Sequence, residues 1–412
     1  MQLIETLTKL LEKNLCNHCL GRFYSSLLYK LSNEERGKTL KAIMALAIDA
    51  KLIDYSKVNL NNFYEFKFKQ NKDLPLIKKE SCYLCDNLFE NIDSFVKKAI
   101  KKLEKIQFNN FLVGSRISNE ILEKEEKLWE ITGINYVESI KSEVNREIGK
   151  KIKEIVKKPI NYKNPEVVIL ADFEKNDVEI QINSLYILGY YKKFARGIPQ
   201  CKWGTPGKYK TSVQEIVAKP IMKITKGKNN FFHGYGREDI NARCLDWRPF
   251  VIEITHPKIR NFNLKNVEKQ INKSKKIKVK LLKVVDKFTV KRIKSEAGDK
   301  TYKVIVKLNK KVEKNDLEKL KNLIGVIQQR TPLRVAHRRA DLIRKRIVKS
   351  IKYKQINKKT IELVIKTNAG LYVKELVTGD NGRTKPSVSD LLNVKAKPIN
   401  LDVIKIEKPK NL

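Results

Sequence analysis

The residues best suited to chemistry lie in one segment, 233–254, which reads HGYGREDINARCLDWRPFVIEI. Gly234 and Gly236 stand just before Arg237 and Asp239, and glycine tolerates the backbone angles of a tight turn. The segment therefore predicts a turn that presents a cation and a carboxylate, followed by a strand. A carboxylate on a rigid turn can act as a nucleophile or a general base. The alternative is a glycine-rich loop whose arginine and aspartate only pair with each other.

Two later segments add candidate residues. Residues 300–308 alternate between polar and apolar types and predict a strand with Tyr302 near its start. The segment 367–384 carries Lys374 before a turn with two glycines, and three further candidates for a binding site are Tyr372, Leu376 and Arg383. Taken alone, a tyrosine in a strand usually packs in the core, and the second segment fits a solvated surface strand and turn.

A run of cations lies between these two segments. Its members are Arg330, Arg334, Arg338, Arg339, Arg344, Lys345 and Arg346. Arginine forks suit phosphate groups, and the Thr331-Pro332 step fixes a sharp entry into the run. A second lysine-rich segment, 273–294, alternates with apolar residues from Ile277 and predicts a strand with one basic face. Solubility explains such a face as well as phosphate contact does.

The composition indicates a polyanionic partner. The 412 residues suffice for two or three domains, and 87 Lys plus Arg against 46 Asp plus Glu give a formal charge of +41. Nucleic acid is the commonest partner of such a chain, although a lysine-rich genome accounts for part of the excess. No apolar run could span a bilayer, and the N-terminal segment MQLIETLTKLLEKN has acids, unlike a signal peptide. We therefore expect a cytoplasmic protein with reduced cysteines.

Two Cys-x-x-Cys pairs predict a metal site in the region 1–92. The four sulfurs belong to Cys16, Cys19, Cys82 and Cys85. Two such knuckles supply the tetrahedral thiolate set of a structural zinc ion, and a helical segment between them must bring them together. His18 lies inside the first knuckle and is a possible competing ligand. A disulfide or a redox dithiol is the alternative, and a reducing compartment disfavours the disulfide.

The next region, 93–193, has an α/β pattern. The sequence predicts strands at 111–117, 165–172 and 178–182, with helices at 95–106, 120–129 and 138–157 and a late aromatic-basic segment at 186–193. This order resembles a THUMP domain, which binds RNA in several tRNA-modifying enzymes. A generic α/β domain without a role in RNA binding is the alternative.

The segments together resemble one enzyme family, the archaeal and eukaryotic tRNA pseudouridine synthases that act on positions 54 and 55 of the T arm. The match covers the loop from Gly236 to Asp239, then Arg243 and Arg248-Pro-Phe, then Lys-Thr-Tyr302, the run from Arg330 and finally Tyr372-Val-Lys374. The chain departs from the family pattern in two places. Asn241 stands where many members carry a second acid, and Asp246-Trp247 replaces a glycine-containing turn.

The resemblance implies roles for these residues. Asp239 would be the single catalytic carboxylate, Tyr302 would stack on a flipped uracil, and Lys374 would pair with Asp239. Contacts to the RNA or the target base would come from Arg237, Arg243, Arg330, Arg334, Arg338, Arg339, Tyr372, Leu376 and Arg383. The isomerisation requires no cofactor, and no phosphate-binding Walker loop or dinucleotide fingerprint is present in the sequence.

The resemblance also implies the architecture. We expect an α+β protein with a zinc-binding helical unit at 1–92, a THUMP-like RNA-binding domain at 93–193 and a catalytic domain at 194–412 around a mixed, mostly antiparallel sheet. The expected partner is the T arm of tRNA. Two other functions remain open: a THUMP-type tRNA enzyme of different chemistry, and a zinc-containing tRNA-binding protein without activity.

Overall fold

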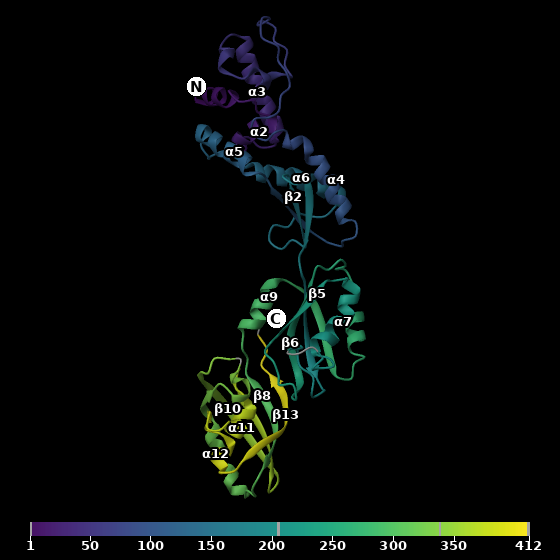
Figure 1. Ribbon diagram of the computed structural model, residues 1–412, viewed down its shortest axis with the longest axis vertical. Coiled ribbons are helices and arrows are strands. Elements are labelled where there is room, and N and C mark those ends of the chain that lie inside the picture. Colours follow the sequence, from purple (N-terminus) through teal and green to yellow (C-terminus); the bar gives the residue numbers. More distant parts are fainter. Residues whose placement is uncertain (1, 204–206, 338, 410–412) are drawn as a thin grey trace. The chain divides into compact units, whose positions relative to one another are not determined.

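The computed structural model describes residues 2–203, 207–337 and 339–409. The chain forms two compact units, Met1–Asn183 and Ser184–Leu412 (Figure 1). The boundary expected after residue 193 therefore lies ten residues earlier. The cause is strand β4 (Leu185–Lys193), which pairs with strands of the second unit rather than with the first. Among the described helices, none combines the length and the apolar character needed to cross a membrane.

The first unit packs helices on a small sheet. Its helices are α1 (Gln2–Leu11), α2 (Asn17–Gly21), α3 (Asn33–Asp49), α4 (Ile92–Leu103), α5 (Asn119–Thr132) and α6 (Ile140–Val156). Its strands are β1 (Phe111–Arg116), β2 (Val167–Asp172) and β3 (Asp177–Ile182), with β1 parallel and β3 antiparallel to the central β2. One hydrophobic core extends from Leu7 to Val178, so the cysteine-containing helices and the α/β part share a single interior.

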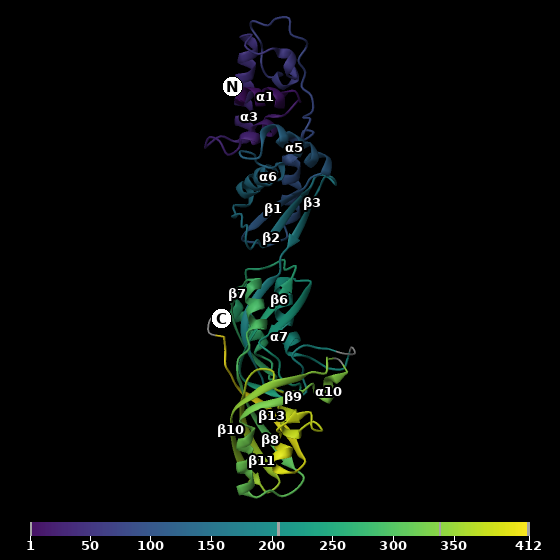
Figure 2. The same cartoon turned by 90° about the vertical axis from the view of Figure 1, so that its left-hand side faces the viewer.

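The second unit is built on one ten-stranded sheet (Figures 1 and 2). After β4 its strands are β5 (Asn229–Gly234), β6 (Arg243–Thr255), β7 (Ile277–Val285), β8 (Lys300–Leu308), β9 (Gly325–Arg330), β10 (Ile343–Asn357), β11 (Thr360–Thr367), β12 (Thr384–Lys385) and β13 (Ala396–Ile406). The order is β12-β9-β10-β11-β8-β13-β6-β4-β7, and β5 pairs with β6. Only β13 and β6 are parallel among these described pairs, which confirms the mixed, mostly antiparallel sheet expected from the sequence.

Short helices close the faces and ends of this sheet. They are α7 (Val213–Thr225), α8 (Leu264–Ile271), α9 (Lys287–Ser295), α10 (Leu333–Ala336), α11 (Val373–Thr378) and α12 (Val388–Leu392). Helix α9 corrects the prediction of one continuous strand in the lysine-rich segment. The strand β7 ends at Val285, and the Asp286 side chain accepts a hydrogen bond from the backbone N–H of Thr289 and so caps a helix. The buried residues change from alternate positions to Val290 and Ile293, which is helical spacing.

Candidate active site and metal centre

The loop that carries Asp239 joins β5 to β6. Gly236 has φ +72°, and a Cβ atom there would lie 3.3 Å from Nη1 of the buried Arg248. Both the conformation and the close contact favour glycine. After this turn the Asp239 carboxylate accepts a hydrogen bond from the backbone N–H of Asn241 at 3.0 Å. The turn predicted from the two glycines is therefore present and fixes the direction of the acid.

Two cations from distant segments face the Asp239 carboxylate. Lys374 Nζ, in α11, lies 2.9 Å from Oδ1, and Arg334 Nη1, in α10, lies 3.8 Å from Oδ2. Burial raises the pKa of Asp239, but the hydrogen bonds from Lys374 and Asn241 and the charge of Arg334 outweigh it and lower the pKa below its ordinary value. The carboxylate is therefore ionised at neutral pH and half-buried. Such a group can attack or stabilise an electron-poor carbon.

Arg334 is shared between two carboxylates. Its Nε lies 2.6 Å from Oε1 of the buried Glu375, and its guanidinium carbon lies 5.7 Å from the centre of the Tyr372 ring. The Tyr372 hydroxyl accepts a hydrogen bond from Arg339 at 3.0 Å. The cation run and the segment around Lys374 thus meet beside Asp239.

A buried polar cluster lies beneath the loop. The Glu238 side chain is fully buried and accepts a hydrogen bond from the Tyr191 hydroxyl at 2.8 Å, with Arg248 Nε at 3.2 Å and Lys193 Nζ at 3.6 Å. Lys193 also donates to the backbone carbonyls of Ile198 and Ile240 at 2.9 and 3.1 Å, and to that of Asp239 at 3.2 Å. The main chain of the Asp239 loop is therefore anchored from below by one ammonium group. Sequence reasoning did not find Lys193, because a single lysine at a strand end carries no local signal of burial.

Tyr302 lies on β8 at the expected position, opposite Ile365 of β11 and Val403 of β13. Its half-buried ring packs against the core cluster that includes Ala242. Burial raises the pKa of Tyr302 to about 12, although Arg248 opposes the shift, so the phenol remains protonated at neutral pH. Two residues earlier, the buried Lys300 lies 5.6 Å above the Tyr235 ring, and burial together with Arg248 lowers its pKa to about 8.

Three more of the candidate arginines take part in contacts within the protein. Arg243 makes a two-point ion pair with Asp402 of β13 at 3.0 and 2.6 Å, which ties β6 to β13. Arg383 donates to the Thr331 carbonyl at 3.0 and 2.8 Å and shares Asp341 with Arg330. These arginine side chains therefore stabilise the fold around the site through contacts within the protein.

The remaining candidates have different outcomes. Arg237 is an exposed cation on the Asp239 loop, beside the Cys201 thiol. Leu376 is fully buried in the core beneath α11, so it supports the helix that carries Lys374. Arg338, also expected to contact RNA, lies outside the described residues.

The four cysteines of the two knuckles converge in the first unit. Their Sγ atoms all lie within 4.8 Å of one another, and the Cys16 and Cys85 sulfurs are 3.7 Å apart. Tetrahedral zinc with Zn–S bonds of about 2.3 Å requires sulfur separations of about 3.8 Å. The donor set and its burial therefore fit one metal ion.

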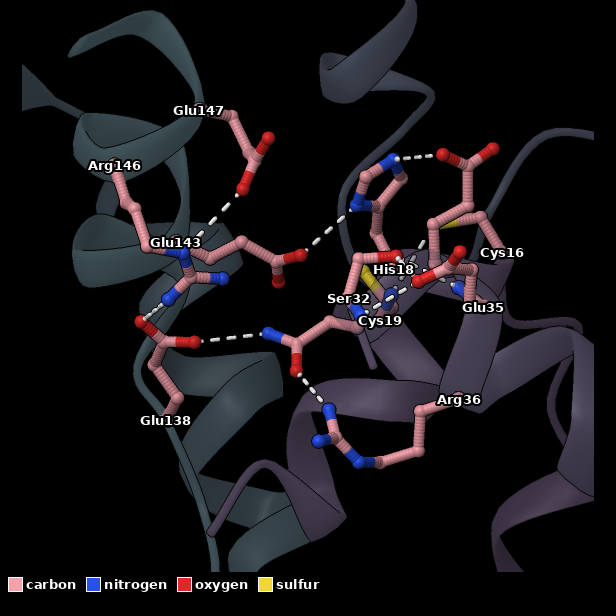
Figure 3. Close-up of polar contacts among 12 residues, drawn as sticks. Cys16, His18, Cys19, Ser32, Glu35, Arg36, Glu138, Glu143, Arg146 and Glu147 are labelled. Atoms are coloured by element: carbon pink, nitrogen blue, oxygen red, sulfur yellow. Dashed lines mark hydrogen bonds and ion pairs between the residues drawn. The ribbon is translucent and has the colours of Figure 1, made fainter. Parts of the chain in front are cut away.

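The surroundings of the sulfurs support this assignment. The side chains of Arg22 and Lys41 are buried nearby, and burial lowers the pKa of Lys41 whereas the charges of Cys16 and Cys82 oppose that shift. Four thiolates on a divalent ion leave a net negative charge, which such cations offset. The His18 side chain points toward Glu143, with Nδ1 2.8 Å from Glu143 Oε1 (Figure 3). Its ring also stacks on Phe89.

Comparison with known proteins finds family matches in both units. Residues 186–407 match the family model described as Pus10, C-terminal, and residues 95–172 match the archaeal Pus10 THUMP domain. The protein named tRNA pseudouridine synthase Pus10 of Pyrococcus furiosus is 38% identical over 410 residues, which cover 98% of each chain. The protein of the same name from Methanothrix thermoacetophila is 36% identical over 426 residues, covering 98% of this chain and 94% of its own.

A solved structure is also similar, though weakly. The chain titled "Crystal Structure of a Cbf5-Nop10-Gar1 Complex" has a TM-score of 0.31 and 16% identity, and the match covers 53% of this chain and 48% of that chain. This likeness is too low to support an argument. The family models and the near full-length relatives are sufficient, and on their evidence the chain belongs to the Pus10 family, whose curated members are named tRNA pseudouridine synthases.

Proposed function

We propose that this protein isomerises uridine to pseudouridine at position 54, position 55 or both in the T loop of tRNA. The observation that carries the proposal is the ionised Asp239, held on a tight turn between Lys374 and Arg334. The names of the relatives support tRNA as the substrate, and the resemblance to the T-arm enzymes supports the two positions.

The chemistry needs one carboxylate. The bond between N1 and C1′ of uridine breaks, the uracil rotates, and a new bond joins C5 to C1′; C5 loses a proton and N1 gains one. Product and substrate have the same atoms and oxidation state. Asp239 acts at the sugar, either as a nucleophile at C1′ or through a glycal, and both routes use an ionised acid. Lys374 keeps it ionised and oriented.

The target base must leave its stack to reach this acid. A T-loop uridine is packed in folded RNA, and flipping it out costs a few kcal/mol, of which stacking on an aromatic side chain returns about 1–3 kcal/mol. We assign this stacking to Tyr302, whose phenol is protonated and whose ring is held by the core on both sides of β8. Tyr302→Phe should then retain more activity than Tyr302→Ala.

Phosphate contacts are assigned to the cations around the site. Arg334 and Arg339 lie beside Tyr372, and Arg330 and Arg383 are oriented by Asp341. Arg237 adds an exposed charge on the Asp239 loop. In the first unit the four cysteines would hold a structural zinc ion, which has no part in the reaction.

One experiment tests the function directly. An unmodified tRNA transcript is incubated with the protein, treated with carbodiimide and mapped by primer extension. Stops at position 54 or 55 that appear with the wild-type protein and are absent with Asp239→Asn are expected. No pseudouridine anywhere in the transcript would refute the enzyme, and pseudouridine only outside the T loop would refute the proposed positions.

A further inference from the structure

We propose that the loop 25–31 and the cavity beside it bind an unpaired nucleotide of RNA, with the base on Tyr29 and the phosphate among the neighbouring cations. This loop lies in the first unit between a short 3-10 helix and α3. Tyr29 is 99% exposed and Leu28 is 75% exposed. An aromatic ring and a leucine that are both largely exposed at adjacent positions are typical of a binding surface.

The loop is held in an unusual conformation. Leu28 has φ +57° and Lys30 has φ +68°, and residues other than glycine rarely adopt such angles. The buried Arg36 maintains it by donating from Nε and Nη2 to the single carbonyl of Leu27 at 3.2 and 3.0 Å, and from Nη2 to the carbonyls of Leu28 and Leu31. Most of the hydrogen bonds of the buried Arg36 side chain go to the backbone of this exposed loop and hold its strained conformation. Strained backbone that is held in this way is typical of functional sites.

The adjacent cavity is basic and rich in hydroxyl groups. Its volume is about 730 Å³, and four cations line it: Lys30, Arg36, Arg146 and Lys150. Four serines line it as well, among them Ser32 and Ser139, which cap the first turns of α3 and α6. One lining carboxylate, Glu138, is occupied by Asn33 and Arg146 (Figure 3). Arg146 and Lys150 also pair with Glu147, but four cations against one lining carboxylate still leave an excess of positive charge around the hollow, which favours an anion.

The combination identifies the ligand class. A phosphate alone would need no exposed ring, and an apolar peptide would need no cations, whereas a nucleotide needs both. The base must be unpaired, because a duplex hides the faces on which Tyr29 could stack. Burial lowers the pKa of Arg36 and the like charge of Arg146 adds to this shift, whereas the charges of Glu138 and Glu143 oppose it. The inference rests on the proposed function only in taking RNA as the substrate.

The test compares two matched double variants of the full chain. Tyr29→Ala/Lys30→Gln removes the ring and the charge, and Tyr162→Ala/Lys163→Gln removes another exposed Tyr-Lys pair elsewhere in the same unit. Binding of a fluorescein-labelled single-stranded RNA and steady-state kinetics on tRNA are measured for both. We expect the first variant to bind the single strand about tenfold more weakly and to raise KM for tRNA with kcat unchanged. The second variant should match the wild type.

A positional readout completes the test. A single strand that contains 4-thiouridine is cross-linked by light, and the labelled peptides are identified by mass spectrometry; residues 25–31 should be among them. Equal affinities of the two variants, or cross-links confined to residues 184–412, would overturn the inference. If the wild type makes no pseudouridine but the first variant alone loses single-strand binding, the proposed reaction fails while this site stands. Equal thermal unfolding of both variants and the wild type confirms that the fold is intact.

Discussion

At the scale of single residues, the charge on Asp239 decides the chemistry. The acid sits half-buried between Lys374 and Arg334, and its partners lower its pKa against the effect of burial. The neighbouring Glu238 is a different kind of acid, because it is fully buried and neutralises Lys193 and Arg248 under the loop. The two adjacent carboxylates thus have different roles: Asp239 faces the site, and Glu238 stabilises the buried cations beneath it.

The first prediction concerns Asp239→Asn. The change keeps the shape but removes the charge, so we expect the isomerisation rate to fall by about 10³-fold or more while tRNA affinity changes little. Single-turnover rates and filter binding measure the two quantities. Asp286→Asn is the isosteric control, since asparagine caps a helix as well as aspartate does. If the Asp239→Asn protein remained active, the catalytic carboxylate would have to be another residue.

A second prediction follows from the pKa of Asp239. Because the folded pKa is lowered, the wild-type rate should stay flat from about pH 7 to about pH 5 and fall only near or below the ordinary value of about 3.9. In Lys374→Ala burial remains but the main stabilising bond is gone, so the acid limb of kcat should move to higher pH. Lys374→Arg should restore most of the wild-type profile. An unchanged limb in Lys374→Ala would contradict the pairing.

At the scale of elements, the site depends on how β4, the Asp239 loop and α11 are fixed. Lys193, the last residue of β4, holds three carbonyls around the loop. The sequence indicated which segments form the site, because their order matches the family. It did not indicate that Arg334 is shared with Glu375, that Arg243 ties β6 to β13, or that β4 joins the second unit. These depend on long-range packing of residues whose neighbours in sequence look ordinary.

The third prediction is that Lys193→Met disturbs the loop without touching the substrate. Methionine retains the volume but leaves Glu238 with less compensation and frees the Asp239 carbonyl. Breaking one partner of a buried ion pair costs about 3–5 kcal/mol, so the free energy of unfolding should fall by about 3 kcal/mol. In the folded fraction kcat should decrease with KM for tRNA retained. A rise in KM with kcat unchanged would place Lys193 in RNA binding instead.

The fourth prediction concerns the metal centre. Elemental analysis of protein purified without added metal should give about one zinc per chain, because the four sulfurs fit a single tetrahedral ion. Cys16→Ser should lower the thermal stability of the first unit, since the sulfurs are part of its hydrophobic core. Cys201→Ser removes a thiol outside the cluster and is the control. Folded protein with a metal content near zero would refute the assignment.

At the scale of the whole molecule, the main feature is the large excess of positive charge. With 87 basic and 46 acidic residues the chain carries +41, and cations surround both the Asp239 site and the cavity of the first unit. The composition predicted a polyanionic partner, yet it could not locate the contacts. Several of the arginines expected to contact RNA also stabilise the fold, so charge counting overstates the number available for phosphate.

The fifth prediction is the salt dependence that this charge implies. Each neutralised phosphate releases counterions, so the logarithm of the tRNA affinity should fall linearly with the logarithm of the salt concentration, with a slope of several units. Titrations between about 50 and 200 mM salt measure the slope. Arg339→Ala should reduce the slope by about one if that side chain contacts phosphate. An affinity independent of salt would contradict a phosphate-based interface.

The position of β13 in the sheet has a consequence for synthesis on the ribosome. This strand comes after all the others in the chain, yet it lies between β8 and β6 in the middle of the sheet. Until residues 396–406 have left the ribosome, the Asp239 loop on β6 and the β8 strand that carries Tyr302 have no common neighbour to join them. A nascent or truncated chain without residues 396–406 therefore holds every catalytic candidate but lacks the strand that joins β8 to β6 and carries Asp402, the partner of Arg243, and we expect it to be inactive.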